Sequence, residues 1–281
     1  MIGVELALML RRRRVWLCWA LLCALPALVA VLLAVTGLAP PPGRGQAFLS
    51  AVVSNGQIYP AAALALVLPV FLPITVAVVS GDAVAGEAST GMLRYLLVRP
   101  VSRLRLLAAK LVSVAVFTLL SVALVTVTSY IVGIAAFGFG GSTGGATPTV
   151  VGFGAVPSLS GPVIEPVDLV TRTMLTVGYL ALCMLALGAI GIFFSTLTDS
   201  PLAAALGVLA VVVTSASLQP LDAAGAIEQF LPTTHWLAWV DLFRDPVLYD
   251  SVSTGALVQL SYVAVAFGAA WANLATKDVT S

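Results

Sequence analysis

Charged side chains are scarce in this sequence of 281 residues, of which 9% are Asp, Glu, Lys or Arg and 60% are hydrophobic. Soluble domains carry roughly 25% charged residues, so the composition indicates an integral membrane protein. The formal net charge is only +1. No field of one sign therefore surrounds the molecule, and we expect no nucleic-acid partner.

Histidine and cysteine are also rare. The three cysteines, Cys18, Cys23 and Cys183, all lie in apolar runs, where buried thiols are expected instead of a disulfide or a metal site. The single histidine, His235, precedes Trp236, and we interpret it as an interfacial hydrogen-bonding group. One histidine with scattered carboxylates gives little basis for an active site. We expect no catalytic residue, no metal and no cofactor in this chain.

A phosphate-binding loop is missing as well. The sequence has no G-x-x-x-x-G-K-[ST] pattern, because its two lysines, Lys110 and Lys277, lie in AAKLV and ATKDV. That pattern supplies the lysine that contacts the phosphates of ATP. The chain is therefore not expected to hydrolyse ATP by that route.

Long apolar runs make up most of what is present. A helix needs about 20 apolar residues to cross a bilayer core, and a lipid-exposed segment must be helical because its backbone groups need partners. We predict an all-α integral membrane protein, with one transmembrane domain over 1–281. The six predicted spans are 15–38, 58–80, 111–137, 173–194, 201–218 and 255–275. Pro60, Pro69 and Pro73 predict a kink or local unwinding in the second span.

The basic residues predict the orientation. Six spans place both termini on one side, and the side that holds the N-terminus carries ten of the thirteen Lys and Arg residues. Basic residues are enriched in cytoplasmic loops. We therefore expect a multi-pass protein of the cytoplasmic (inner or plasma) membrane with both termini in the cytoplasm.

Three segments outside the spans have interpretable patterns. Residues 1–14 end in Arg11, Arg12, Arg13 and Arg14, which is typical of an interfacial elbow helix with its arginines at anionic headgroups. Alternatively, these arginines only fix the topology of the first span. The loop 138–168 is rich in Gly, Ser, Thr and Pro, so we expect a flexible outer loop.

The outer loop 219–254 is expected to form short helices in the outer leaflet. Pro232 should divide it into two pieces. Trp236 and Trp239 suggest an aromatic belt at the membrane boundary.

The densest charge lies between the second and third spans, in 81–110. Its charged residues are Asp82, Glu87, Arg94, Arg99, Arg103, Arg105 and Lys110. Gly81 and Asp82 are expected to end the second span, and apolar spacing over 88–98 predicts a short surface helix. This helix should stop before Pro100, and Ser102 is a natural N-cap for the next helix. Such a region, 81–105, could pass a push from a cytoplasmic partner into two spans; alternatively it is an ordinary positively charged loop.

The run GDAVAGEASTGMLRYLLVRPVSRLRLLAAK (81–110) resembles a signature of type-2 ABC-transporter permeases, found between their second and third spans. The pattern is an acidic residue, a spacer, GE, G-[TM]-L-R, RPVSR and a lysine in the next helix. The matching residues are Asp82, Gly86, Glu87, Gly91, Leu93, Arg94, Arg99, Pro100, Ser102, Arg103 and Lys110. Met92 stands where threonine is common. The segment LPTTHW (231–236) is similar to the family's last outer loop.

The resemblance implies a permease that pairs with a second copy or a paralogue and binds a separate ABC nucleotide-binding subunit, which would hold ATP and Mg²⁺. Residues around 87–99 would form the coupling helix. The residues it implies in coupling are Asp82, Gly86, Glu87, Gly91, Leu93, Arg94, Arg99, Pro100 and Arg103.

The resemblance further implies an exporter. A pathway without fixed charge suits an amphiphilic or hydrophobic substrate such as a drug, an antibiotic or a lipid. An ion-coupled carrier or channel is one alternative, and the lack of ionisable residues in the predicted spans counts against it. A non-transporting membrane scaffold is another.

Overall fold

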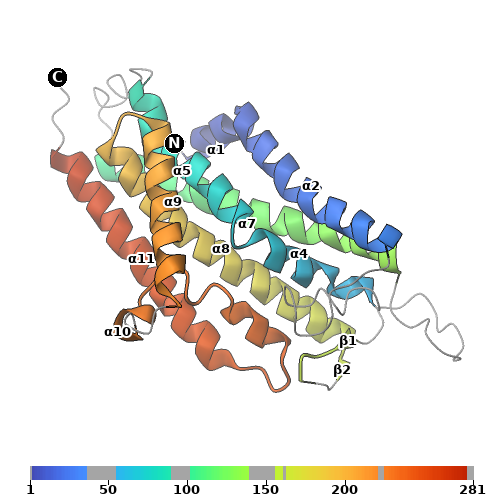
Figure 1. Ribbon diagram of the computed structural model, residues 1–281. Helices are drawn as coiled ribbons and strands as arrows, with labels where there is room; N and C mark the ends of the chain where they lie inside the picture. The colour runs from blue at the N-terminus through green and yellow to red at the C-terminus, as the bar shows by residue number, and fades with distance from the viewer. Residues whose placement is uncertain are drawn as a thin grey trace, which may run out of the picture.

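The computed structural model describes residues 2–36, 55–89, 102–138, 156–160, 163–220 and 225–276. Six of its helices are long and apolar enough to cross a membrane, which confirms the prediction of a multi-pass helical protein. They are α2 (Arg13–Thr36), α5 (Phe71–Ser89), α7 (Arg103–Phe137), α8 (Pro166–Leu197), α9 (Pro201–Leu218) and α11 (Tyr249–Thr276). In Figure 1, α2, α7, α8 and α11 run along a common direction, and α9 is inclined to them.

The α8 helix is the centre of the bundle, because it packs against α5, α7, α9 and α11. Polar side chains tie other helices together. The Trp19 indole of α2 donates to Ser121 Oγ of α7 at 2.9 Å, and the Asn273 amide of α11 donates to the Thr196 carbonyl of α8 at 2.9 Å. Interhelical hydrogen bonds of this kind supplement van der Waals packing in membrane proteins.

The second predicted span is broken into two helices, as its prolines suggested. A 3-10 turn, η1 (Gly56–Ile58), leads into α4 (Tyr59–Val67), and α5 begins at Phe71 after a turn. Pro69 and Pro73 carry no N–H to donate to the preceding turn, so a continuous helix would lose two hydrogen bonds one turn apart at this point.

The predicted end of this span at Gly81 and Asp82 is wrong, because α5 continues to Ser89. Gly81 instead permits close packing against α9: a Cβ at this position would lie 2.9 Å from Ala205 N and 3.0 Å from Pro201 O. Ser195 Oγ of α8 also donates to the Gly81 carbonyl at 2.7 Å. Small residues let membrane helices approach each other in this way.

Two other helices begin earlier than predicted. Because α8 starts at Pro166 and α11 at Tyr249, polar residues such as Asp168 and Arg172 belong to the helices and not to the loops. Ser102 is the N-cap of α7, as predicted, and its Oγ accepts a hydrogen bond from Arg105 N at 3.4 Å. The α9 helix has the predicted bounds.

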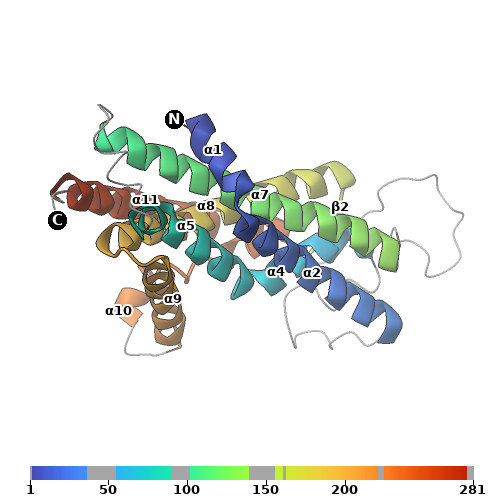
Figure 2. The same ribbon diagram turned by 90° about the horizontal axis from the view of Figure 1, so that it is seen from above.

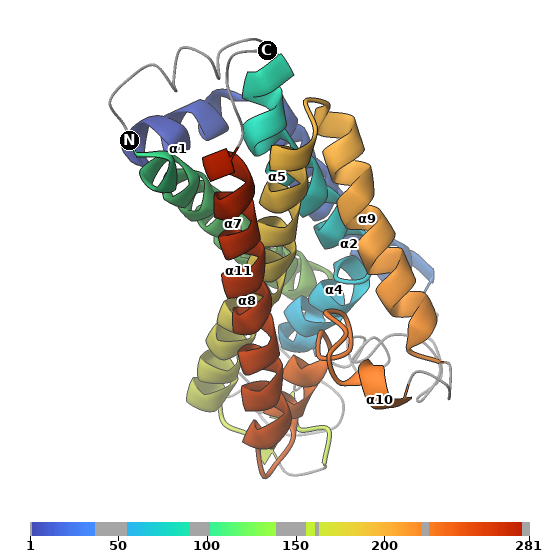
Figure 3. The ribbon, with the colours of Figure 1, turned by 90° about the vertical axis from the view of Figure 1, so that its left-hand side faces the viewer.

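The N-terminal segment forms a separate short helix, α1 (Ile2–Arg11), before α2. Figure 2 shows α1 crossing α7, and Figure 3 shows it running across one end of the bundle. Its location at a membrane interface stays a prediction.

The loop 219–254 contains two short helical pieces, α10 (Gly225–Glu228) and η3 (Ala238–Phe243), with Pro232 in the turns between them. Two pieces divided near Pro232 were predicted. The aromatic-belt interpretation is wrong, because Trp236 is 5% exposed and Trp239 is 0% exposed inside the protein core.

The other predicted outer loop, 138–168, is described only in part. Within it β1 (Val156–Pro157) pairs antiparallel with β2 (Val163–Ile164), and α8 then begins. Most of the stretch predicted to be flexible, like the predicted surface helix beyond Ser89, lies outside the described residues.

Candidate functional site

The acidic residues of the central stretch meet basic residues at one end of the bundle. Asp82 and Glu87 lie on the last turns of α5, and Lys110 lies on α7. Because α1 runs across this end (Figure 3), residues 5–14 also reach the same place. Charged residues of α1, α2, α5 and α7 therefore meet at this end of the bundle.

The Lys110 ammonium lies between two carboxylates. Its Nζ donates to Glu87 Oε1 at 2.5 Å and to Glu5 Oε1 at 3.5 Å. The side chains of Lys110 and Glu87 are only 2% and 7% exposed. A charge so deeply buried is tolerated only when it is paired and hydrogen-bonded, so each member of this group depends on the others.

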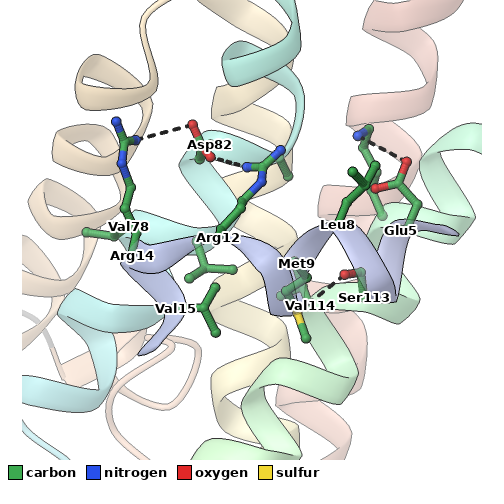
Figure 4. Close-up of a pocket in the computed structure, with 13 residues that line it drawn as sticks. Glu5, Leu8, Met9, Arg12, Arg14, Val15, Val78, Asp82, Ser113 and Val114 are labelled. Carbon is green, nitrogen blue, oxygen red and sulfur yellow. Dashed lines mark hydrogen bonds and ion pairs between the residues drawn. The ribbon is translucent and has the colours of Figure 1, made fainter. Parts of the chain in front are cut away.

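Asp82 is the second centre of the network. Arg12 Nη1 donates to its Oδ2, and Arg14 Nη1 lies 3.5 Å from its Oδ1. In Figure 4 these two arginines reach Asp82 from opposite sides. Gly86 follows Asp82 by one helical turn, and a Cβ on Gly86 would overlap Asp82 Oδ1. The glycine therefore leaves the carboxylate in place for its arginine partners.

A small pocket separates the two charge centres. Its lining includes the α1 residues Leu8 and Met9 and the α7 residues Ser113 and Val114 (Figure 4). Ser113 Oγ lies 3.5 Å from Met9 Sδ. The volume of about 40 Å³ is comparable to the space of one water molecule. The ion pairs around this pocket can join helices, but the pocket is too small to hold an organic ligand.

Arg103, a predicted coupling residue, lies apart from this network. As the first residue of α7 it donates from Nη1 to the Leu274 and Ala275 carbonyls at 2.6 and 2.8 Å. It thus caps the last turn of α11, where cations are favoured by the helix dipole.

The predicted coupling residues are therefore only partly brought together. Asp82, Gly86 and Glu87 lie in one network, and Arg103 lies at the end of α11. The remaining five fall in 90–101, outside the described residues: Gly91, Leu93, Arg94, Arg99 and Pro100.

The four predicted elbow arginines divide into two pairs. Arg12 and Arg14 bind Asp82. Arg11 and Arg13 are exposed and form no ion pair with any residue that the structure describes. Glu5 was missed by sequence reasoning, although it is the only acidic residue in 1–14. A single acidic residue in an otherwise apolar and basic segment could have indicated a specific basic partner.

Within the described ranges, no group of three or more His, Cys, Asp or Glu residues could hold a metal ion. His235 has a structural role: its ring Nε2 lies 3.2 Å from the Gln229 carbonyl, and its own carbonyl accepts from the Tyr179 hydroxyl at 2.6 Å.

Comparison of the sequence with known proteins identifies the family to which the chain belongs. No curated protein matches the sequence. One family model matches residues 20–220, which is more than half of the chain and includes Asp82, Glu87 and Lys110 but not α1. The chain therefore belongs to the family described as "Protein of unknown function (DUF2705)".

Proposed function

We propose that this chain is the membrane-spanning subunit of an ATP-driven ABC exporter, energised by a separate nucleotide-binding subunit that holds ATP and Mg²⁺. The substrate would be amphiphilic or hydrophobic, such as a drug, an antibiotic or a lipid. The chain would act in the cytoplasmic membrane with both termini in the cytoplasm, paired with a second copy or a paralogue.

The observation that carries this proposal is the buried Glu87–Lys110 pair. Glu87 precedes the segment 90–101 and Lys110 follows it, and the two side chains join α5 to α7 at 2.5 Å. In the permease signature that 81–110 resembles, this intervening segment is where the ATPase subunit docks. The ion pair therefore supports a function in which both flanking helices respond together to a force on that segment.

Glu5 extends the same coupling to α1 through its contact with Lys110. Arg12, between α1 and α2, and Arg14, in α2, contact Asp82. Removing one partner of a buried ion pair leaves an uncompensated charge. Displacing α5 from α7 carries that penalty, so the three helices would move as one body when the partner pushes.

The direct test is affinity purification of the tagged full-length chain in mild detergent, with bound proteins identified and ATPase activity assayed. We expect a nucleotide-binding subunit in stoichiometric amount, lost on Arg94→Ala or Arg99→Ala. Arg105→Ala is the matched control, because Arg105 is an exposed arginine just after the docking segment, and it should retain the partner.

A preparation in which no ATPase subunit co-purifies would contradict the proposal. An ion-coupled carrier or a non-transporting scaffold would then be favoured instead. Uptake driven by an imposed proton gradient in vesicles without ATP would separate these two.

A further inference from the structure

A second cavity lies far from the ion-pair network, between α4, α9 and the segment 233–244. Its volume is about 790 Å³, within the range of about 300–1,000 Å³ that small-molecule sites occupy. The lining is mostly apolar, with residues such as Leu68 and Val212. We call it the α4–α9 cleft.

One wall of the cleft is built around the break in the second span. Ala65 and Pro69 both line it. The residues four positions after them are Pro69 and Pro73, which have no N–H, so neither carbonyl can accept the usual helical hydrogen bond. Non-helical backbone at membrane depth is tolerated where it is buried in protein or lines a cavity. The break thus leaves two residues of the cleft lining with carbonyls that lack their usual helical donor.

The opposite wall carries a buried donor. Trp236 lines the cleft and is 5% exposed, and its indole N–H has no hydrogen-bond partner among the described residues. Buried polar groups in native proteins are normally paired, so an unpaired donor beside a cavity calls for an explanation. The nitrogen itself is enclosed, so a ligand acceptor in the cleft supplies the missing partner when the indole ring turns toward the cleft.

This wall is also held rigidly. Three side chains of α8 and α11 bind the backbone carbonyls that flank Trp236: Tyr262 binds Phe230 O at 2.7 Å, Gln259 binds Pro232 O at 2.8 Å and Tyr179 binds His235 O at 2.6 Å. The cleft is therefore preformed, which lowers the entropic cost of binding.

The charges at the cleft compensate each other. Arg244 Nε binds Asp241 Oδ1 at 2.9 Å, and Asp241 also accepts from the Ser251 hydroxyl at 2.6 Å. Gln219 and Thr233 add neutral polar groups, joined at 2.6 Å. With no net charge in its lining, the cleft favours an uncharged ligand.

We propose that the α4–α9 cleft binds an uncharged amphiphile whose apolar body carries both a hydrogen-bond acceptor and a donor, such as an amide or a hydroxyl group. The acceptor binds the Trp236 indole, and the donor binds the carbonyls of Ala65 and Pro69. This inference rests on the proposed function in so far as it names the substrate class of the exporter, but the binding site itself needs no ATPase.

The test uses the purified full-length chain in nanodiscs, without nucleotide or partner. The probe is a dodecanoyl amide whose alkyl chain carries a photoreactive diazirine, and the labelled peptides are identified by mass spectrometry. We expect the probe to label α4, α9 and 233–240. Excess dodecanamide should suppress this labelling, whereas excess dodecane, which lacks hydrogen-bonding groups, should not.

Two variants locate the site. Trp236→Phe keeps an aromatic ring but removes the donor, so the apparent affinity should fall about tenfold; Trp271→Phe, a tryptophan of α11 outside the cleft lining, is the control. Ala216→Trp should fill the cleft and abolish labelling, whereas Val213→Trp, on the same helix but outside the lining, should not.

Labelling spread evenly over all lipid-facing helices, or unchanged in both cleft variants, overturns the proposal. The outcome is independent of the pull-down. Specific labelling without a co-purified ATPase subunit would support the binding site and contradict the exporter. A co-purified ATPase subunit without specific labelling would support the exporter and contradict the binding site.

Discussion

At the scale of single residues, the buried Lys110 ammonium requires carboxylate partners close by. It is held by Glu87 and Glu5, and its side chain is 2% exposed. We expect Glu87→Ala to destabilise the protein by up to about 3–5 kcal/mol, because it leaves the buried ammonium with only the more distant Glu5 carboxylate, at 3.5 Å. Thermal unfolding of the detergent-solubilised protein measures this loss, with the fraction that stays monodisperse after heating as the readout.

The double variant Glu87→Leu/Lys110→Met tests the cause. Replacing both charges by apolar groups of similar volume is often neutral, so its stability should lie much closer to wild type than that of Glu87→Ala. If the losses of the two single substitutions simply add in the double variant, the two residues are not coupled and the assignment of the pair is incorrect.

The four arginines at the junction of α1 and α2 should differ in effect, although sequence alone treats them alike. Arg12→Gln/Arg14→Gln removes the partners of Asp82 and should release α1, raising its cleavage by protease from the cytoplasmic side. Arg11→Gln/Arg13→Gln removes the same total charge from exposed positions and should leave cleavage unchanged. Equal cleavage of α1 in both double variants would indicate that the arginines act only through their total charge.

At the scale of helices, the contact between α5 and α9 depends on a single missing side chain. Gly81→Ala would place a Cβ against backbone atoms of Ala205 and Pro201, which cannot rotate away. Overpacking of this kind costs typically about 1–3 kcal/mol, so the melting temperature should fall. Gly178→Ala, in α8, meets nothing within 4 Å and should be neutral or slightly stabilising.

The existence of the helices could be predicted from sequence, but several of their contacts could not. Apolar length decides the spans because lipid forbids unpaired backbone, and prolines one helical turn apart, Pro69 and Pro73, disfavour a continuous second span. Gly81 is ambiguous, since a glycine can end a helix or admit a neighbour. Trp236 and Trp239 are ambiguous in the same way, because an indole suits either a membrane boundary or a protein core.

The ion-pair network shows a different limit. Glu5 and Lys110 are far apart in sequence, and only the crossing of α1 over α7 brings them together. No local pattern specifies that crossing. The start of α8 was also placed too late, at 173 instead of Pro166, because a composition criterion begins a span after the last charged residue, whereas a helix can continue into water.

At the scale of the whole molecule, the two candidate sites lie on different elements and do different things. The network of Asp82, Glu87 and Lys110 joins helices around a volume of about 40 Å³, whereas the α4–α9 cleft encloses about 790 Å³. The α4–α5 unit takes part in both, with Glu87 near one end and Ala65 on the other side of the proline break. We therefore expect a displacement of α5 to move the wall of the cleft that the break forms.

This arrangement depends on the orientation of the chain, which the distribution of basic residues predicts and a labelling experiment can measure. In a variant with the three native cysteines replaced by alanine, single cysteines are introduced by Ser89→Cys at the end of α5 and Ser253→Cys near the start of α11. Both positions are exposed. A membrane-impermeant maleimide should label the residue at 253 in intact cells, and the residue at 89 only after permeabilisation, because ten of thirteen basic residues lie on the side of 89. The opposite result would place the segment 90–101 outside the cell, where no ATP-driven partner could reach it, and the proposed exporter would fail together with the orientation.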